Sequence, residues 1–231
     1  MKIPDKVKFL LILCSGLIFF IPACVDTGVQ TIPYSIDQRS EVSFVNAVTG
    51  GGTASFTIDG NALTVDFGAE SNAYNVPAGS KNLSVNFAAG GTGTYNFSVD
   101  VDYKFRVFLY GTTASSESKR FALRRVDGTL STNPDSALVA FFNGSPESTL
   151  DGLTVISPTD TVEVSFETSV GYGDMSDMMT FAPGDYMVGL SYNDSLATSN
   201  GFTFNVSAGG RYTAVSYDTL STMKLTVLTD N

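Results

Sequence analysis

The stretch Val42-Ser43-Phe44-Val45-Asn46-Ala47 has a counterpart in the second half of the chain, Val139-Ala140-Phe141-Phe142-Asn143-Gly144. Both stretches are rich in Val and Phe, which are enriched in β-strands. Segments of the same kind, such as Leu83-Ser84-Val85-Asn86-Phe87, recur along the chain between clusters of Gly, Asn, Asp and Ser that favour turns. The pattern predicts an all-β protein with many short strands.

Two further blocks recur in the same order as the first. Residues 65–79 match residues 170–184 without gaps, and residues 97–105 match residues 204–212. The spacing between partners lengthens from block to block, as expected if loops grew after a duplication. Chance can produce one such match, but three in one order favour a duplicated domain.

The repeat boundaries define the expected domains. We expect two tandem immunoglobulin-like β-sandwich domains, at residues 41–127 and 136–231, because each is close to the ~100 residues of such a sandwich. A turn-rich linker is expected over residues 128–135, which contain Asn133-Pro134-Asp135. Within the first domain, Asp59-Gly60 predicts a two-residue hairpin turn. Phe105-Arg106-Val107-Phe108-Leu109 is interpreted as another alternating strand.

The N-terminus has the features of a signal peptide. Residues 1–8 carry three lysines and one aspartate, and an apolar run follows over residues 9–21, as in the charged and hydrophobic regions of such peptides. An uncleaved membrane anchor is the alternative, but the run is shorter than the ~20 apolar residues that a spanning helix needs. The run ends in Ile21-Pro22-Ala23-Cys24, which resembles the lipobox of bacterial lipoproteins.

This resemblance implies a signal peptide over residues 1–23, cleavage before Cys24 and lipid on the Cys24 thiol and amine. Two or more acyl chains anchor a protein stably in a membrane. Residues 24–40 are then the lipidated cysteine and a tether. Because Val25 rather than an aspartate follows Cys24, the resemblance favours the outer membrane, with neither face preferred.

Composition restricts the possible functions. Removing residues 1–23 shifts the net charge from −10 to −12 and leaves a chain with no His, no Trp and Cys24 as its one cysteine. Zinc sites built on His or Cys and nucleophilic triads that need His are thereby excluded. The remaining bases are scattered, whereas nucleic-acid binding needs basic patches. We therefore expect no nucleic-acid partner, no cofactor and no metal.

Several motifs of the first half follow one another in a characteristic order: Val42-Ser43-Phe44-Val45-Asn46-Ala47, Ile58-Asp59-Gly60, Val65-Asp66-Phe67-Gly68, Val76-Pro77-Ala78-Gly79 and Tyr103-Lys104-Phe105-Arg106-Val107. They resemble the DUF4397 family, in two copies that cover most of residues 41–228. The second copy departs from the pattern, since Pro183 stands one place later than Pro77 and a longer stretch, residues 151–164, replaces the Asp-Gly hairpin. The resemblance implies an exported immunoglobulin-like sandwich and transfers no active-site residue.

Two kinds of residue cluster are candidates for binding. The pairs Asp100/Asp102 and Asp174/Asp177 could contribute to a calcium site, but neither lies in a loop with enough oxygen ligands, so solvated turns are favoured. Met175, Met178 and Met179 near Tyr172 are interpreted as core filling at a strand edge, with an adaptable contact surface as the alternative.

The leading functional hypothesis is a non-catalytic, membrane-anchored envelope lipoprotein that binds a glycan or a protein. A second hypothesis is a structural subunit of a pilus or envelope assembly, in which Met223-Lys224-Leu225-Thr226-Val227-Leu228 could pair with a neighbour. The last strand of the second domain is the favoured interpretation of that segment. A third hypothesis, the least favoured, is a glycoside hydrolase that uses carboxylates alone.

Overall fold

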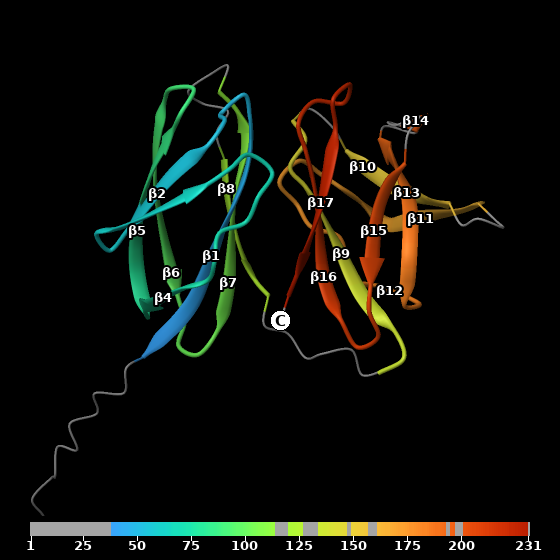
Figure 1. Ribbon diagram of the computed structural model, residues 1–231, viewed down its shortest axis with the longest axis horizontal. Helices are drawn as coiled ribbons and strands as arrows, with labels where there is room; N and C mark the ends of the chain where they lie inside the picture. The colour runs from blue at the N-terminus through green and yellow to red at the C-terminus, as the bar shows by residue number, and fades with distance from the viewer. Residues whose placement is uncertain are drawn as a thin grey trace, which may run out of the picture. The chain divides into compact units, whose positions relative to one another are not determined.

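The computed structural model describes residues 38–113, 120–126, 134–146, 149–156, 161–192, 195–196 and 201–230 (Figure 1). They belong to one compact unit, Gln38–Asn231. The predicted signal peptide, Cys24 and most of the predicted tether lie outside the described residues. No helix within these ranges is long and apolar enough to cross a membrane.

Eight strands form the first sandwich: β1 (Arg39–Thr49), β2 (Ala54–Ile58), β3 (Asn61–Val65), β4 (Tyr74–Pro77), β5 (Gly79–Phe87), β6 (Thr92–Val99), β7 (Lys104–Thr112) and β8 (Arg120–Arg125). Sheet A has the order β4-β1-β7-β8, and sheet B has the order β3-β2-β5-β6. Strand β1 begins at Arg39, so the last two residues of the predicted tether already belong to the sandwich.

The second sandwich repeats this arrangement: β9 (Ala137–Asn143), β10 (Leu150–Ile156), β11 (Thr161–Val170), β12 (Met179–Phe181), β13 (Gly184–Tyr192), β14 (Ser195–Leu196), β15 (Phe202–Val206), β16 (Arg211–Tyr217) and β17 (Lys224–Thr229). Sheet C has the order β12-β9-β16-β17, and in sheet D the order β11-β10-β13 is completed by β14 and β15. The first strand of each sandwich pairs in parallel with a later one, β1 with β7 and β9 with β16. The predicted fold class, two tandem β-sandwiches, is confirmed.

The two repeats share hydrogen bonds as well as strand order. The Gly68 amide donates to the Asn46 carbonyl, and the Gly173 amide donates to the Asn143 carbonyl, both over 2.7 Å. Each asparagine is fully buried and donates through Nδ2 to the last carbonyl of a neighbouring strand, at 3.1 Å in the first sandwich and 3.0 Å in the second. The matched sequence blocks therefore occupy equivalent places.

Each sandwich has its own apolar core. Alternating residues of sheets A and B, including Phe44, Phe56 and Leu83, form the first core, and residues of sheets C and D form the second. The predicted turn at Asp59 and Gly60 joins β2 to β3, and both residues have positive φ, 49° and 79°. This is the backbone conformation that Asp-Gly favours in a two-residue hairpin.

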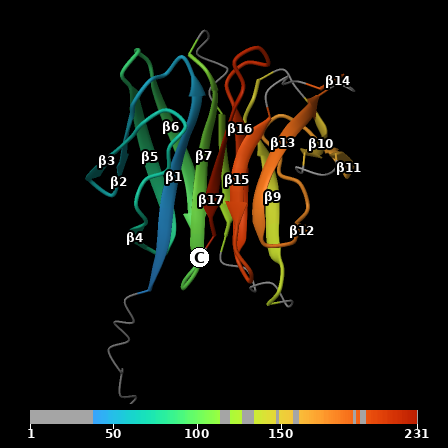
Figure 2. The same cartoon turned by 45° about the vertical axis from the view of Figure 1, so that its right-hand side comes forward.

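A third cluster joins the two sandwiches. It contains residues on the faces of sheets A and C that point away from their own cores: Val45, Ala47, Phe108, Tyr110, Ala122, Phe142, Val215, Tyr217 and Leu228. Phe108 and Phe142 stack at its centre, with ring centroids 4.2 Å apart. The strands of sheets A and C, including β1, β7, β16 and β17, lie in the middle of the molecule in Figure 1, between sheets B and D, and Figure 2 shows the same strands after a 45° turn.

The strand expected over residues 105–109 is part of β7, and both of its faces are buried. Phe105, Val107 and Leu109 do point into the first core, but Arg106 and Phe108 on the opposite face are also buried. A strand covered on both faces carries a continuous apolar run instead of an alternation.

Candidate functional site

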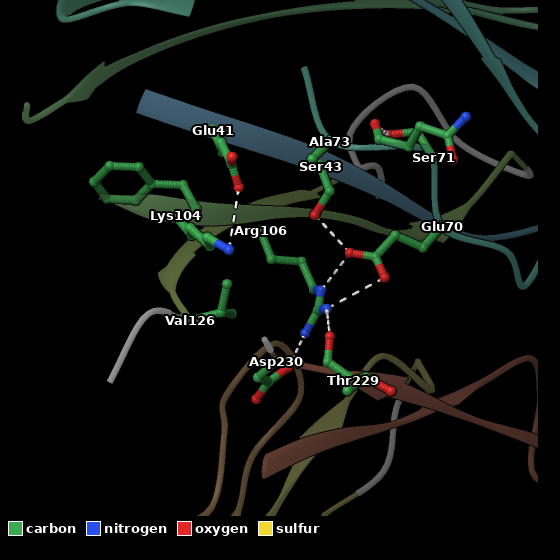
Figure 3. A pocket seen from close by; sticks show the side chains of 12 residues that line it. Glu41, Ser43, Glu70, Ser71, Ala73, Lys104, Arg106, Val126, Thr229 and Asp230 are labelled. Atoms are coloured by element: carbon green, nitrogen blue, oxygen red, sulfur yellow. Dashed lines mark hydrogen bonds and ion pairs between the residues drawn. The ribbon is translucent and has the colours of Figure 1, made fainter. Parts of the chain in front are cut away.

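A polar pocket of about 260 Å³ opens where β1 and β7 meet the end of β17 (Figure 3). Its walls come from both sandwiches, and they include Glu41, Ser43, Glu70, Ser71, Asn72, Ala73, Lys104, Phe105, Arg106, Val126, Thr229 and Asp230. The pocket places three carboxylates and two cationic groups around one cavity. Its chemistry depends on how those charges are paired.

Arg106 is the centre of this site. The residue is 2% exposed, and its guanidinium donates to Glu70 through two bonds, Nε to Oε1 at 2.6 Å and Nη2 to Oε2 at 3.2 Å. The same group reaches the second sandwich, where Nη1 donates to Asp230 and Nη2 donates to the Thr229 carbonyl at 3.1 Å. Planar guanidinium donors suit such bidentate pairing.

The two carboxylates have further partners. Ser43 Oγ donates to Glu70 Oε1 over 2.5 Å. Asp230, which is 5% exposed, accepts from Thr213 Oγ1 at 3.0 and 2.8 Å and lies 3.9 Å from Arg211 Nε. Buried charges are costly unless they are paired and hydrogen-bonded. The network meets that condition and links the sandwiches.

The arrangement of the carboxylates is not that of a glycosidase. In such enzymes one carboxyl group protonates the leaving group while the other faces the sugar or a water molecule. Here Glu70 and Asp230 both accept from the same guanidinium, which lies between them (Figure 3). We interpret the pocket as the open end of a structural link.

Among the described residues, the link of Arg106 with Glu70 and Asp230 has no counterpart at the equivalent positions of the other repeat. By strand register, Thr213 occupies the position of Arg106 in the second repeat. Glu70 pairs with Val45 in a single β-bridge, and Met175 occupies the position of Glu70 because it pairs with Phe142 in the same way. Glu70, Arg106 and Asp230 were not predicted from the sequence as site residues. A charged residue inside the apolar run from Phe105 to Leu109 was the available signal.

The methionine cluster divides between two environments. Met175 and Tyr172 pack against the third cluster, between the sandwiches. Met179 packs against the second core. Met178 and Met179 also line a pocket of about 300 Å³ beside Ser176 and Asp177. Core filling therefore accounts for Met179, whereas Met175 belongs to a contact surface within the chain.

All four residues of the two aspartate pairs are exposed and lie between strands. Asp100 and Asp102 lie between β6 and β7, and the Asp100 carbonyl accepts a hydrogen bond from Ser40 Oγ. Asp174 and Asp177 follow β11, and the Asp174 carbonyl accepts from the Asn143 amide at 3.0 Å. The described residues contain no group of three or more His, Cys, Asp or Glu that could hold a metal ion.

The C-terminal segment is the last strand of the second sandwich, as favoured from the sequence. β17 pairs antiparallel with β16, and the pairing runs from Tyr212 opposite Thr229 to Tyr217 opposite Lys224. It stands at the end of the strand order of sheet C, and β8 occupies the equivalent place in sheet A.

The outer face of sheet B is a second candidate site. Its outward residues are Ser, Thr or Asn at every position except one alanine: Ser55, Thr57, Ala62, Thr64, Ser80, Asn82, Ser84, Asn86, Thr92, Thr94, Asn96 and Ser98. Asn82 Nδ2 donates to Asn96 Oδ1 at 3.0 Å, and the hydroxyls of Ser80 and Ser98 lie 3.4 Å apart. A shallow hollow of about 530 Å³ lies over these two pairs.

No model of a known protein family matches the chain, and no curated protein matches it. Solved structures that are similar include a candidate cell adhesion protein from Bacteroides uniformis, with 9% identity, a TM-score of 0.28 and coverage of 84% of this chain and 98% of the other. The tip fimbrial protein Mfa3 from Porphyromonas gingivalis, truncated at its C-terminus, has 8% identity, a TM-score of 0.25 and coverage of 83% and 99%. At these values the function has to be inferred from the residues of the chain itself.

Proposed function

We propose that the chain is a non-catalytic binding module of the bacterial cell envelope, held to the outer membrane by lipid on Cys24. The observation that supports binding is the outer face of sheet B, an exposed surface of uncharged hydrogen-bonding side chains. Regular strands hold these side chains in fixed positions, and binding sites on such elements are more precise than sites on loops.

The junction between the sandwiches supports a passive role. Stacked rings at Phe108 and Phe142 and the buried bonds of Arg106 hold sheet A against sheet C. Interfaces between domains permit relative motion unless they are large and hydrophobic. Because the junction holds the two sandwiches together, we expect the chain to present its binding surface as a rigid scaffold.

The sequence supplies the anchor in this proposal. Fifteen positions separate Cys24 from Arg39, the first residue of β1. A fully extended chain of that length spans at most about 50 Å. The binding surface would therefore stay within reach of envelope polymers close to the membrane.

An assembly subunit is the alternative function. Strands β8 and β17 end the strand orders of sheets A and C, and such edges can accept a strand from another chain. If the chain assembles in this way, the purified protein should form oligomers as its concentration rises. A monomer at all concentrations, measured by sedimentation, would exclude this function.

Protease shaving of intact cells tests the anchor and the location. We expect the wild-type protein to fractionate with the outer membrane and the Cys24→Ala variant to be found in soluble fractions. A wild-type chain that is soluble, or that incorporates no labelled palmitate, would contradict the proposal. Release of its domains from intact cells would indicate the outer face, and protection until lysis the periplasmic face.

A further inference from the structure

We propose that the outer face of sheet B binds a neutral polysaccharide, seated in the hollow over β5 and β6. This inference rests on the proposed binding function and assigns that function a site and a class of ligand. The hollow is lined by Ser80, Lys81, Asn82, Asn96, Phe97 and Ser98.

The asparagine pair gives the hollow its hydrogen-bonding capacity. Asn82 uses one amide hydrogen in its 3.0 Å bond to Asn96 Oδ1. Among the described residues, Asn82 Oδ1 and Asn96 Nδ2 have no partner, so the pair presents an acceptor and a donor to solvent. The hydroxyls of Ser80 and Ser98 lie beside it and can donate or accept. Sugar hydroxyls need this combination of donors and acceptors.

The absence of charge on this face selects a neutral ligand. The chain as a whole carries a net charge of −10, yet none of the outward residues of β2, β3, β5 and β6 is ionisable. Lys81 points inward, where it is 7% exposed and bonds to Asp59 at 2.8 Å. An anionic polymer would therefore find no counter-charge in the hollow.

The composition of the face favours a glycan over a protein. The centres of protein–protein interfaces are enriched in aromatic residues, Met and Arg, and depleted in Ser. Phe97 lies at the hollow but is buried on the core side, and no outward residue of sheet B is aromatic. The array continues across four paired strands, which suits an extended chain of sugars better than a single one.

The second sandwich provides an internal comparison. Strands β13 and β15 pair in the register of β5 and β6, so Met187 and Thr203 take the places of Asn82 and Asn96. Asp185 and Asn205 take the places of the paired serines and are joined by a 2.9 Å hydrogen bond. Met187 is 42% exposed. The duplicate thus lacks the amide pair and carries a charge.

The experiment is affinity electrophoresis of the full-length Cys24→Ala chain in gels that contain one polymer each. The neutral polymers are dextran, mannan and a mixed-linkage β-glucan, and the anionic ones are polygalacturonate and heparin. We expect at least one neutral polymer to retard the chain and neither anionic polymer to do so. The double variant Asn82→Ala/Asn96→Ala should weaken the retardation at least ten-fold.

The matched control is Met187→Ala/Thr203→Ala, at the equivalent positions of the second sandwich, which should leave the retardation unchanged. Thermal melts of both variants check that they fold. Two results would overturn the inference and leave the binding function intact. One is retardation by anionic polymers alone, and the other is retardation by neutral polymers that the Asn82→Ala/Asn96→Ala variant does not weaken. If no polymer retards the chain, the glycan site is wrong. If immobilised envelope proteins are also not bound, the proposed function fails with it.

Discussion

Tyr217 of the second sandwich lies with its hydroxyl against the backbone of Gly68 in the first, so close that a Cβ on Gly68 would be 2.2 Å from the tyrosine oxygen. The reverse contact also exists, because a Cβ on Gly173 would be 2.2 Å from the oxygen of Tyr110. Gly68 and Gly173 occupy equivalent positions in the two repeats, and so do Tyr110 and Tyr217. The two contacts across the junction are therefore equivalent. This reciprocity is the property of an isologous interface, formed here within one chain by two repeats.

The reciprocal contacts predict that Gly68→Ala and Gly173→Ala destabilise the protein by similar amounts. Both glycines have positive φ, 78° and 84°, and both would also collide with a tyrosine ring. We expect a loss of about 3 kcal/mol in each case, measured by urea unfolding. Gly60→Ala is the control, because Gly60 has φ 79° but nothing within 4 Å of an added Cβ. It should cost only about 1 kcal/mol, and an equal loss in all three variants would contradict the contact.

Tyr172→Phe should stabilise the protein. The Tyr172 hydroxyl is buried without a hydrogen-bond partner among the described residues, although its ring packs edge-on against Tyr110 at 5.0 Å. The first repeat has Phe67 at this position, packed edge-on against Tyr217 at 5.1 Å. Removing an unsatisfied buried hydroxyl should add about 1 kcal/mol to the free energy of unfolding.

Tyr192→Phe is the matched control for Tyr172→Phe. The Tyr192 hydroxyl donates to Ser216 Oγ at 2.8 Å, so its loss should lower stability by about 1 kcal/mol. Opposite signs for the two variants are the expected result. A loss of stability in Tyr172→Phe would show that its hydroxyl is satisfied.

The same tyrosines predict a fall in stability at high pH. Burial raises the pKa of Tyr172 to about 12, against a lowering effect of Arg120, and burial also raises the pKa of Tyr192. Between pH 10 and 12 the unfolded chain releases these protons while the folded chain keeps them. Stability should therefore be insensitive to these groups below pH 10 and fall above it.

A series of melts between pH 9 and 12 measures this slope. Because Tyr172 is partly exposed, its share should be at most about 1 kcal/mol per pH unit. Tyr172→Phe and Tyr192→Phe should each reduce the slope, because burial raises the pKa of both groups. A Tyr172→Phe variant with the wild-type slope would contradict the assignment.

The strands and the repeat could be predicted from the sequence, because turn residues and matched blocks are local features. Asp59-Gly60 predicted its hairpin, and the matched blocks predicted the equivalence of Gly68 and Gly173. The junction was missed because burial of a strand's second face depends on a partner far away in the sequence. The bond from Arg106 to Asp230 joins residues 124 positions apart, and no local pattern specifies such a pair.

Arg106→Met should destabilise the protein strongly. It leaves Asp230, 5% exposed, and Glu70 without their guanidinium partner, and breaking a buried ion pair on one side costs about 3 to 5 kcal/mol. The double variant Arg106→Met/Asp230→Asn should recover part of that loss, because the neutral amide no longer needs a counter-charge. Lys104→Met removes an exposed cation that pairs with Glu41 at 3.3 Å and should cost less than about 1 kcal/mol. Equal losses for the Lys104 and Arg106 variants would contradict the role of the link.

Phe108→Asp should separate the unfolding of the two sandwiches. Each sandwich has a core of its own, so cooperativity between them depends on the third cluster, and Phe108 stacks on Phe142 at its centre. The wild-type chain should unfold in one calorimetric transition, because a buried apolar junction couples the two cores. A carboxylate placed against Phe142 would be buried without a partner and would open the junction. The variant should then show two transitions, each with roughly half of the total enthalpy.

Phe56→Leu in the first core is the comparison, since it should lower the melting temperature and keep a single transition. One transition in Phe108→Asp would mean that the sandwiches are coupled by contacts other than this cluster.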